Sequence, residues 1–192
     1  MPRVATGYPE LVTSLPSKVA LRQVVRERIS QLSVSQRSAR SAQVVEWLRP
    51  RVAAGTILAF MPLPDEVDIV PLLVGLAASG RLVLPRVVDG GIVLHRVANL
   101  DALRVGPMRL REPAPNAVEE LPEDIDVALI PGLAFTRDGG RLGRGKGMYD
   151  RLLPRLRPEV PRIGIAFAEQ IVDELPLEPH DIRLSAVVPV FE

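Results

Sequence analysis

The feature that most constrains the fold of this chain is an apolar run followed by a glycine-rich basic segment. Residues 126–130, Asp-Val-Ala-Leu-Ile, are typical of a buried strand, and five glycines then recur over 139–147 with Arg141, Arg144 and Lys146 between them. Glycines let backbone N–H groups point toward one anion, and basic side chains add the charge that a polyphosphate needs. We therefore expect a nucleotide-binding loop and an ATP-dependent enzyme.

An acidic residue stands just after this loop. Asp150 follows Gly147 by three positions, where a carboxylate is well placed to hold the magnesium ion that accompanies a nucleotide. Residues 140–147 nearly match the P-loop pattern, but Gly147 stands where the magnesium-binding Ser or Thr would be. This departure argues against an ordinary P-loop kinase or GTPase. A surface turn without a ligand is the alternative interpretation of the glycines and charges alone.

Lysine is rare in this chain. Of the 24 Lys and Arg residues, only Lys18 and Lys146 are lysines. A lysine amid such an arginine excess indicates a site that needs a compact ammonium instead of a planar guanidinium. Lys146 lies in the glycine loop, and Lys18 shares a predicted helix face with Arg22, four residues further on. That pair is either a solvated helix face or a second arm that reaches the same phosphates.

The composition argues against several classes of protein. A net charge of +1 is too small for a broad nucleic-acid or anionic-membrane surface. The chain has no cysteine, so it has no disulfides, thiolate zinc site or cysteine nucleophile. The longest apolar stretch, 69–78, contains a proline and is far shorter than the roughly 20 residues of a membrane helix. Because the N-terminus lacks an apolar signal segment, we expect a cytoplasmic protein.

The order of apolar runs predicts an α/β fold. Strands are expected over 56–60, 81–85, 92–96 (a hairpin after Gly90-Gly91), 126–130, 162–167 and 184–190. Helices are expected over 17–32, from a cap at Ser35 to Pro50, over 67–79 and over 148–156. We interpret residues 1–16 as a loose leader and 106–122 as a loop. This alternation predicts a single domain over 1–192, with a mostly parallel sheet covered by helices on both faces.

In sheets of this kind, ligands bind beyond the carboxyl ends of the strands. The glycine loop follows the strand predicted at 126–130 directly. The fold and the loop chemistry therefore predict the same location for the site.

Several short motifs, taken in order, resemble one enzyme family. This set closely resembles the signature of the 5-formyltetrahydrofolate cyclo-ligase family, over nearly the full chain. The motifs are Lys18-x-x-x-Arg22, the run 65–68 (Asp-Glu-Val-Asp), Glu112-Pro113, the run 131–135, the glycine loop 140–147, Tyr149-Asp150-Arg151, the run 166–170 and His180-Asp181.

The resemblance implies a Rossmann-like fold, similar to the NagB/RpiA/CoA-transferase type, in a cytoplasmic monomer. It also implies an enzyme that uses ATP and Mg²⁺ to convert 5-formyltetrahydrofolate to 5,10-methenyltetrahydrofolate. The formamide oxygen would be phosphorylated, the neighbouring anilino nitrogen would attack the activated carbon, and phosphate would leave as the ring closes. Such chemistry depends on positioning and charge neutralisation, which a basic glycine loop with magnesium provides.

The resemblance further assigns roles to individual residues. Arg144 and Lys146 would be catalytic, and Asp150 and Asp181 would bind magnesium. The folate would contact Met61, Glu66 and Tyr149, with Glu66 accepting from the N–H groups of the pterin. ATP would be held by Lys18, Arg22, Arg141, Leu142, Gly143, Arg144, Gly145, Lys146, Gly147, Met148 and Tyr149.

Several of these residues also have a structural interpretation. Asp150 and Glu66 could be acids favoured at helix starts by the helix dipole. Phe60 and Tyr149 could be ordinary core aromatics. We expect His95 to be exposed on the hairpin.

Several residues depart from the family pattern, including Val188-Pro189, which stands where a hydroxyl residue is common. Met148 stands where an aromatic residue is usual, and Thr136 and Ser185 replace aspartates. Two other functions therefore stay open: an ATP-dependent enzyme acting on another amide or formamide, and a non-catalytic nucleotide-binding relative. The presence of Lys146 and Asp150 favours catalysis.

Overall fold

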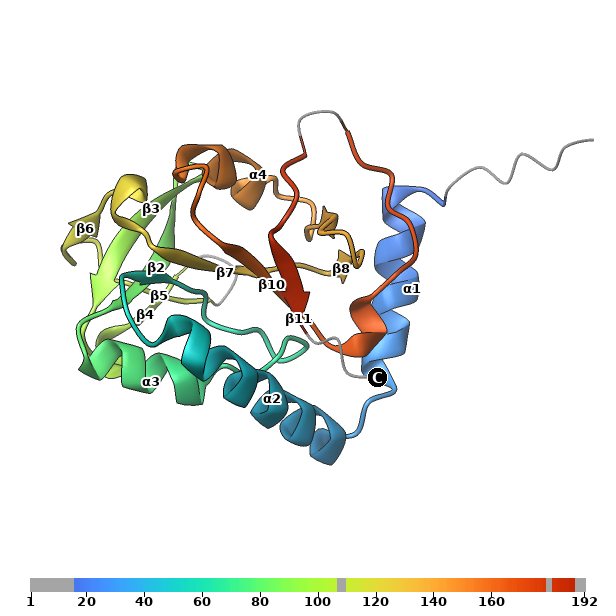
Figure 1. Ribbon diagram of the computed structural model, residues 1–192, viewed down its shortest axis with the longest axis horizontal. Coiled ribbons are helices and arrows are strands. Elements are labelled where there is room, and N and C mark those ends of the chain that lie inside the picture. Colours follow the sequence, from blue (N-terminus) through green and yellow to red (C-terminus); the bar gives the residue numbers. More distant parts are fainter. Residues whose placement is uncertain (1–15, 107–109, 179–180, 189–192) are drawn as a thin grey trace, which may run out of the picture.

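The computed structural model describes residues 16–106, 110–178 and 181–188, which form a central sheet with helices around it (Figure 1). The neighbours in this sheet follow the order β11, β10, β7, β1, β2, β3, β6. The first five are parallel to one another, β3 pairs antiparallel with β2, and β6 pairs antiparallel with β3 at the edge. Their bounds are β1 (Ile57–Leu58), β2 (Leu82–Val88), β3 (Gly91–Val97), β6 (Glu119–Glu120), β7 (Val127–Pro131), β10 (Arg162–Ile165) and β11 (Ala186–Val188).

The described residues contain four α-helices: α1 (Lys18–Ser30), α2 (Val34–Leu48), α3 (Val70–Ala78) and α4 (Met148–Leu152). The hydroxyl of Ser17 caps α1 as predicted, accepting from the Ala20 N–H at 3.2 Å. The predicted cap of α2 at Ser35 is wrong, because Ser33 caps that helix. Ser33 and Gln36 exchange side-chain and backbone hydrogen bonds, a reciprocal pair that satisfies two backbone donors.

The third helix begins later than predicted, at Val70 instead of residue 67. The Asp68 side chain accepts from the Val70 N–H at 2.9 Å, and a proline follows in the first turn. Proline suits that turn because its missing N–H has no helical partner there. The residues just before, including the fully buried Ile69, belong to an irregular loop.

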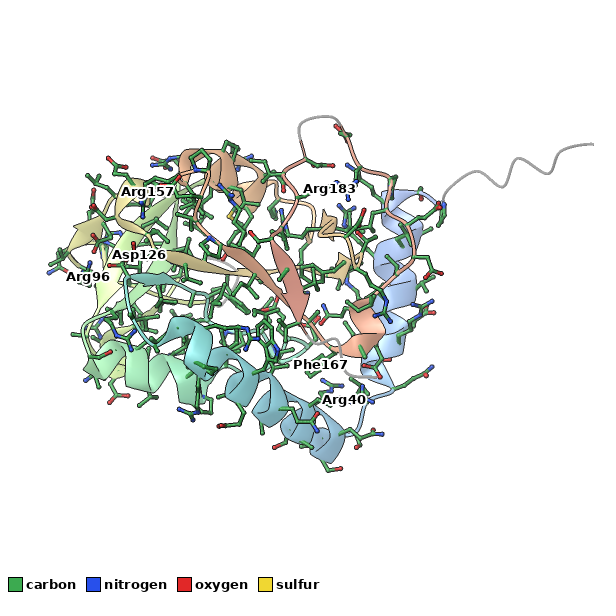
Figure 2. The ribbon with its side chains drawn as sticks, in the orientation of Figure 1. Arg40, Arg96, Asp126, Arg157, Phe167 and Arg183 are labelled. Carbon is green, nitrogen blue, oxygen red and sulfur yellow. The ribbon has the colours of Figure 1, made fainter. Side chains whose placement is uncertain are left out.

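Helices cover both faces of the sheet (Figure 1). On one face α2 and α3 pack on Ile57 and Phe167, and Figure 2 shows Phe167 between the sheet and α2. On the other face the region of α4 packs on Leu58 and Phe135. Neighbouring residues of β1 thus enter opposite core clusters, as a strand buried on both faces requires. The predicted mostly parallel α/β fold is confirmed.

The hairpin forms as predicted, with β2 and β3 paired antiparallel from Leu82 to Val88. Residues 106–122 are not all loop, because they include β6 and β5 (Arg111–Glu112), which pairs with β4 (Arg104–Val105). The expectation that His95 is exposed is wrong. Since β6 covers β3, this side chain is 1% exposed, and its Nδ1 lies 3.0 Å from the Ala117 carbonyl oxygen.

The strand order places a change of direction at the centre of the sheet. From β1 the chain proceeds to β2 on one side, and it later returns to β7 on the other side of β1. A crevice is expected at such a switch point, beyond the carboxyl ends of the strands. After β7 the chain forms a small hairpin of β8 (Ala134–Phe135) and β9 (Arg141–Leu142), from which the glycine loop leads into α4.

The described residues also form short 3₁₀-helices: η1 (Arg49–Val52), η2 (Leu100–Ala102), η4 (Pro122–Asp124), η5 (Leu153–Arg155) and η6 (Ala168–Gln170). None of the helices in the described residues is long and apolar enough to cross a membrane. The predicted leader and His180 lie outside the described residues, apart from residue 16 of the leader.

Candidate active site

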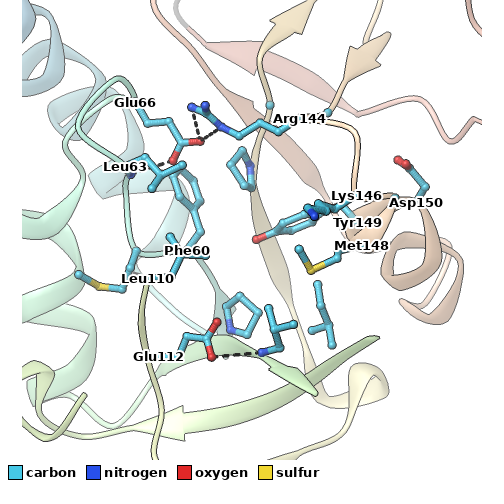
Figure 3. Close-up of a pocket in the computed structure, with 18 of the residues that line it drawn as sticks. Phe60, Leu63, Glu66, Leu110, Glu112, Arg144, Lys146, Met148, Tyr149 and Asp150 are labelled. Carbon is cyan, nitrogen blue, oxygen red and sulfur yellow. Dashed lines mark hydrogen bonds and ion pairs between the residues drawn. The ribbon is translucent and has the colours of Figure 1, made fainter. Parts of the chain in front are cut away.

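A cavity of about 250 Å³ opens at the carboxyl ends of β1, β2 and β7. Much of its wall is apolar, and Figure 3 shows Phe60, Tyr149 and Met148 around it. Of its polar groups, Glu66, Arg144 and Lys146 lie toward the glycine loop and Glu112 lies at the other end (Figure 3). Such a shape suits a flat, largely apolar molecule with a few oriented polar groups.

A second, smaller hollow of about 50 Å³ shares a wall with this cavity. Arg141, Gly143 and Asp150 line both spaces. The rest of the smaller hollow is rich in charged side chains, which include Lys18, Arg22 and Asp181. The glycine loop therefore separates a polar hollow from a largely apolar cavity.

Thr136 fixes the turn that precedes the glycine loop. Its hydroxyl accepts from the Gly140 N–H at 2.9 Å and donates to Asp138. Gly139, with a φ of +91°, donates from its N–H to the Thr136 carbonyl oxygen at 3.0 Å. That left-handed conformation favours glycine. Thr136, which replaces an aspartate of the family pattern, thus stabilises the backbone of the hairpin.

Helix α1 docks on the glycine loop through Arg22. The Nε of Arg22 donates to the Gly143 carbonyl oxygen at 2.9 Å, across 121 positions of sequence. The same guanidinium lies over Gly145, whose φ of +100° is also in the left-handed region. Lys18, one turn earlier, donates to Glu178 at 2.7 Å and lies 3.9 Å from Asp181. Arg22 thus contacts the loop, and both side chains line the smaller hollow beside it. Their role as a second arm that reaches the phosphates stays a prediction.

Arg144 connects the glycine loop to the loop after β1. It donates to both carboxylate oxygens of Asp65, at 3.0 and 2.8 Å, and from its Nε to Glu66 at 3.0 Å. Burial raises the pKa of Glu66 above its ordinary value, although the Arg144 charge and the Leu63 N–H oppose this shift. Burial alone would lower the pKa of Arg144, but its bonds to the two acids outweigh that effect and raise it.

Tyr149 and Asp150 begin α4 and both contact Arg141. The Arg141 guanidinium lies 5.6 Å from the centre of the Tyr149 ring, a cation–π distance, and it also donates to Asp150. Burial and the Glu66 charge raise the pKa of Tyr149, so this phenol stays protonated at neutral pH. Lys146 is exposed at the cavity edge, and its ammonium makes no ion pair with any described residue.

The donor set can accommodate a magnesium ion that accompanies a nucleotide. Asp150 and Asp181 both line the smaller hollow. No cluster of three or more acids or histidines occurs among the described residues. Magnesium commonly binds through one or two carboxylates plus substrate phosphates, so two acids beside a basic hollow fit it.

Comparison with known proteins identifies the family. Residues 15–190 match the family model described as 5-formyltetrahydrofolate cyclo-ligase family. The chain belongs to this family. The 5-formyltetrahydrofolate cyclo-ligase of Mycolicibacterium smegmatis is 32% identical over 183 residues, which covers 90% of this chain and 93% of that protein. The prediction of a cyclo-ligase enzyme is thereby confirmed.

Two solved structures share the fold. The NMR structure of Aquifex aeolicus 5,10-methenyltetrahydrofolate synthetase aligns with a TM-score of 0.78 and 34% identity, covering 88% of each chain. The Mycoplasma pneumoniae 5,10-methenyltetrahydrofolate synthetase aligns with a TM-score of 0.68 and 28% identity, covering 90% of this chain and 98% of that one. The cyclo-ligase fold inferred from the motifs is therefore confirmed.

The fold gathers the residues that the motifs single out. The residues predicted for the folate, Met61, Glu66 and Tyr149, line the larger cavity. Those predicted for ATP and magnesium are divided between the two spaces, and their roles stay predictions. The Ser185 departure lies apart from both, where its hydroxyl accepts from the Arg162 N–H at 3.1 Å.

Two acids of the cyclo-ligase site received no role from the sequence. Asp65 was visible only as the neighbour of Glu66, and Glu112 only as part of an acid–proline pair. Glu112 is 4% exposed and lines the larger cavity. Its neighbours in sequence, Arg111 and Pro113, carry no pattern that marks a buried acid.

Proposed function

We propose that this protein uses ATP and Mg²⁺ to convert 5-formyltetrahydrofolate to 5,10-methenyltetrahydrofolate, releasing ADP and phosphate. The observation that carries the proposal is the wall of Arg141, Gly143 and Asp150 that the two spaces share. A polyphosphate suits the basic hollow and a reduced pterin suits the apolar cavity. Their reacting ends would then meet at the glycine loop.

The reaction divides into two steps. First the formyl oxygen attacks the γ-phosphorus, and the bond between that phosphorus and ADP breaks. Then the anilino nitrogen of the folate attacks the formyl carbon, the carbon–oxygen bond to phosphate breaks, and the nitrogen releases its proton. Neither step needs a covalent bond to the protein, which is consistent with a chain that has no cysteine.

The side chains of the glycine loop would act by position and charge. Lys146, whose ammonium is free of ion pairs in the described structure, would neutralise the transferring phosphoryl group. Arg144 is held by Asp65 and Glu66 at the glycine-loop end of the larger cavity. Lys18 and Arg22 would hold the polyphosphate from the α1 side.

Magnesium would be held by Asp150 and Asp181, which now neutralise Arg141 and Lys18. When bound, the ion would neutralise charge on the phosphate oxygens. Nucleotide binding would then exchange partners, since the two cations would turn to phosphate as the two acids turn to the metal. We further propose that the protein acts as a monomer, which light scattering tests.

The direct test mixes purified protein with 5-formyltetrahydrofolate, ATP and Mg²⁺ and follows the absorbance of the methenyl product. We expect one ADP per methenyl group, and no product when ATP or Mg²⁺ is left out. ATP hydrolysis that requires a different formamide would instead establish the related enzyme as the function. Nucleotide binding without turnover of any formamide would establish the non-catalytic relative.

A further inference from the structure

The larger cavity contains one buried carboxylate whose hydrogen bonding is incomplete. Glu112 ends β5 and is 4% exposed. Its Oε2 accepts from the Val87 N–H over a long 3.4 Å, and its Oε1 has no hydrogen-bond partner among the described residues. Removing a carboxylate from water without supplying donors is costly, so such a group calls for an explanation.

The other buried acid of the cavity, Glu66, has its hydrogen bonds satisfied. Glu66 accepts from Arg144 through Oε1 and from the Leu63 N–H, 3.0 Å away, through Oε2. It lies at the glycine-loop end of the cavity, whereas Glu112 lies at the other end (Figure 3). The acceptor left open for a ligand is therefore that of Glu112.

Burial is the main reason that the carboxyl of Glu112 has a raised pKa. The Val87 N–H and the charge of Arg86 act in the opposite direction. No guanidinium or ammonium among the described residues forms an ion pair with this carboxylate. A donor that entered the cavity would meet an acceptor that the folded chain leaves unsatisfied.

We propose that Glu112 recognises the aminopyrimidinone edge of the reduced pterin, an inference that rests on the proposed function. This edge carries an amino group and a ring N–H side by side, two parallel donors that match the oxygens of a carboxylate. Glu112 thus takes the contact that the family resemblance assigns to Glu66. Glu66 instead keeps Arg144 in place.

This assignment also orients the substrate. With the pyrimidine edge at Glu112, the other end of the pterin, which bears the formyl group, points toward the glycine loop and Lys146 (Figure 3). Phe60, Met148 and Tyr149 line the space between and supply the apolar contact that a flat ring needs. Recognition at one end of the cavity therefore serves transfer at the other.

Gly106 provides an independent way to disturb the same carboxylate. A methyl group on Gly106 would overlap Oε2 of Glu112 and come within 2.7 Å of its Cδ. Gly106→Ala therefore keeps the charge but displaces it. If Glu112→Gln folds poorly, this second variant still tests the proposal.

The experiment measures turnover and, by calorimetry, binding of 5-formyltetrahydrofolate and of its analogue that lacks the 2-amino group. It compares wild type, Glu112→Gln, Gly106→Ala and the control Glu120→Gln, which changes a partly buried acid paired with Arg96 outside the cavity. We expect Glu112→Gln to raise Kd and KM for the folate about 10- to 100-fold. KM for ATP and the control should match wild type.

The analogue separates recognition from a merely structural role. Wild type should bind the analogue more weakly than the folate, and Glu112→Gln should lose most of that discrimination. The variant lacks the carboxylate acceptor and the analogue lacks the amino donor of the same interaction. Wild-type discrimination in Glu112→Gln overturns the proposal, as does an unchanged folate Kd in both Glu112→Gln and Gly106→Ala.

The two proposals fail separately. If Glu112→Gln forms the methenyl product as wild type does, the role of Glu112 is wrong and the proposed function stands. If folate binding depends on Glu112 but no methenyl product forms, the proposed function is wrong and the recognition role stands.

Discussion

Arg144 donates two parallel hydrogen bonds to the carboxylate of Asp65, at 3.0 and 2.8 Å. The first residue belongs to the glycine loop that leads into α4, and the second to the loop that follows β1. Because β1 and β7 are neighbours at the switch point, this fork joins the two loops that border the cavity. A paired guanidinium and carboxylate fix both position and orientation, which a single point charge does not.

Arg144→Lys should therefore impair turnover while keeping the charge. We expect kcat to fall about tenfold or more, because the ammonium cannot bond Asp65 and Glu66 in the same geometry. Steady-state kinetics test this, with Arg26→Lys on the exposed face of α1 as the matched control. Wild-type kcat in Arg144→Lys would show that the fork has no part in catalysis.

Lys146→Ala should remove a contact to phosphate without affecting the fold. The side chain is exposed and lacks an ion pair within the described residues, so the melting temperature should not change. We expect kcat/KM for ATP to fall about 100-fold or more. Lys146→Arg should also be impaired, since the planar group does not replace an ammonium between two glycines.

The control for this change is Arg137→Ala, which removes an exposed basic residue from the preceding turn. Kinetics of Lys146→Arg equal to those of wild type would contradict the requirement for an ammonium. The rarity of lysine in the chain would then have no functional meaning at this position.

Asp150→Asn should weaken magnesium binding and preserve the fold. The amide keeps the shape of the side chain and its contact with Arg141 but loses the charge that a divalent cation requires. The magnesium concentration for half-maximal rate should rise at least about tenfold, and high magnesium should restore part of the rate. Asp124→Asn, in η4, is the control. Unfolding of Asp150→Asn would instead support the helix-start interpretation.

The same reasoning from burial predicts how the stability of Glu112→Gln depends on pH. The pKa of Glu112 in the folded protein lies above its ordinary value of 4.5, so the folded state holds more protons than the unfolded state between the two values. The wild-type free energy of unfolding therefore loses a contribution as pH rises from that ordinary value through the folded-state pKa. Glutamine does not titrate, so the free energy of unfolding of Glu112→Gln does not lose this contribution.

Denaturant unfolding at about pH 4 and at about pH 8 tests this prediction. The free energy of unfolding of the variant, relative to wild type, should increase at the higher pH. An equal difference at both values would show that burial does not perturb this carboxyl. If Glu112→Gln is more stable than wild type but binds the folate more weakly, Glu112 serves binding at a cost in stability.

Much of this fold could be predicted because its signals are local. Ile57 and Leu58 are consecutive apolar residues, each buried against a different core cluster, and a continuous apolar run reports such a strand directly. The docking of α1 was foreseeable for a similar reason. Four-residue spacing places Lys18 and Arg22 on one helix face, and both line the smaller hollow.

The remaining features depend on partners that are distant in sequence. The strand β6 is two residues long and exists because β3 offers its edge, which also buries His95. The burial of Glu112 depends on Val87 in β2 and on the close approach of Gly106. No periodicity within residues 106–122 reports those contacts, so an acid–proline pair alone could not reveal a position in the cavity wall.

Met148 is the departure from the family pattern that lies in the cavity itself. It begins α4, lines the larger cavity beside Tyr149, and packs partly against the core cluster under that helix. A thioether fills space well but offers no flat face to a heterocycle. An aromatic side chain there would add about 0.5–1.5 kcal/mol of ring contact. Met148→Tyr should therefore lower KM for the folate, by about tenfold at most.

The measurement is KM for both substrates, together with the melting temperature. KM for ATP should stay the same, because Met148 lines the larger cavity and not the smaller hollow. Met148→Leu is the matched control, since it keeps the size and apolar character without adding a ring. A lower melting temperature with unchanged KM values would show that tyrosine overpacks the space under α4. The methionine would then serve the packing of that helix, and the ring contact to the folate would have to come from Tyr149 or Phe60.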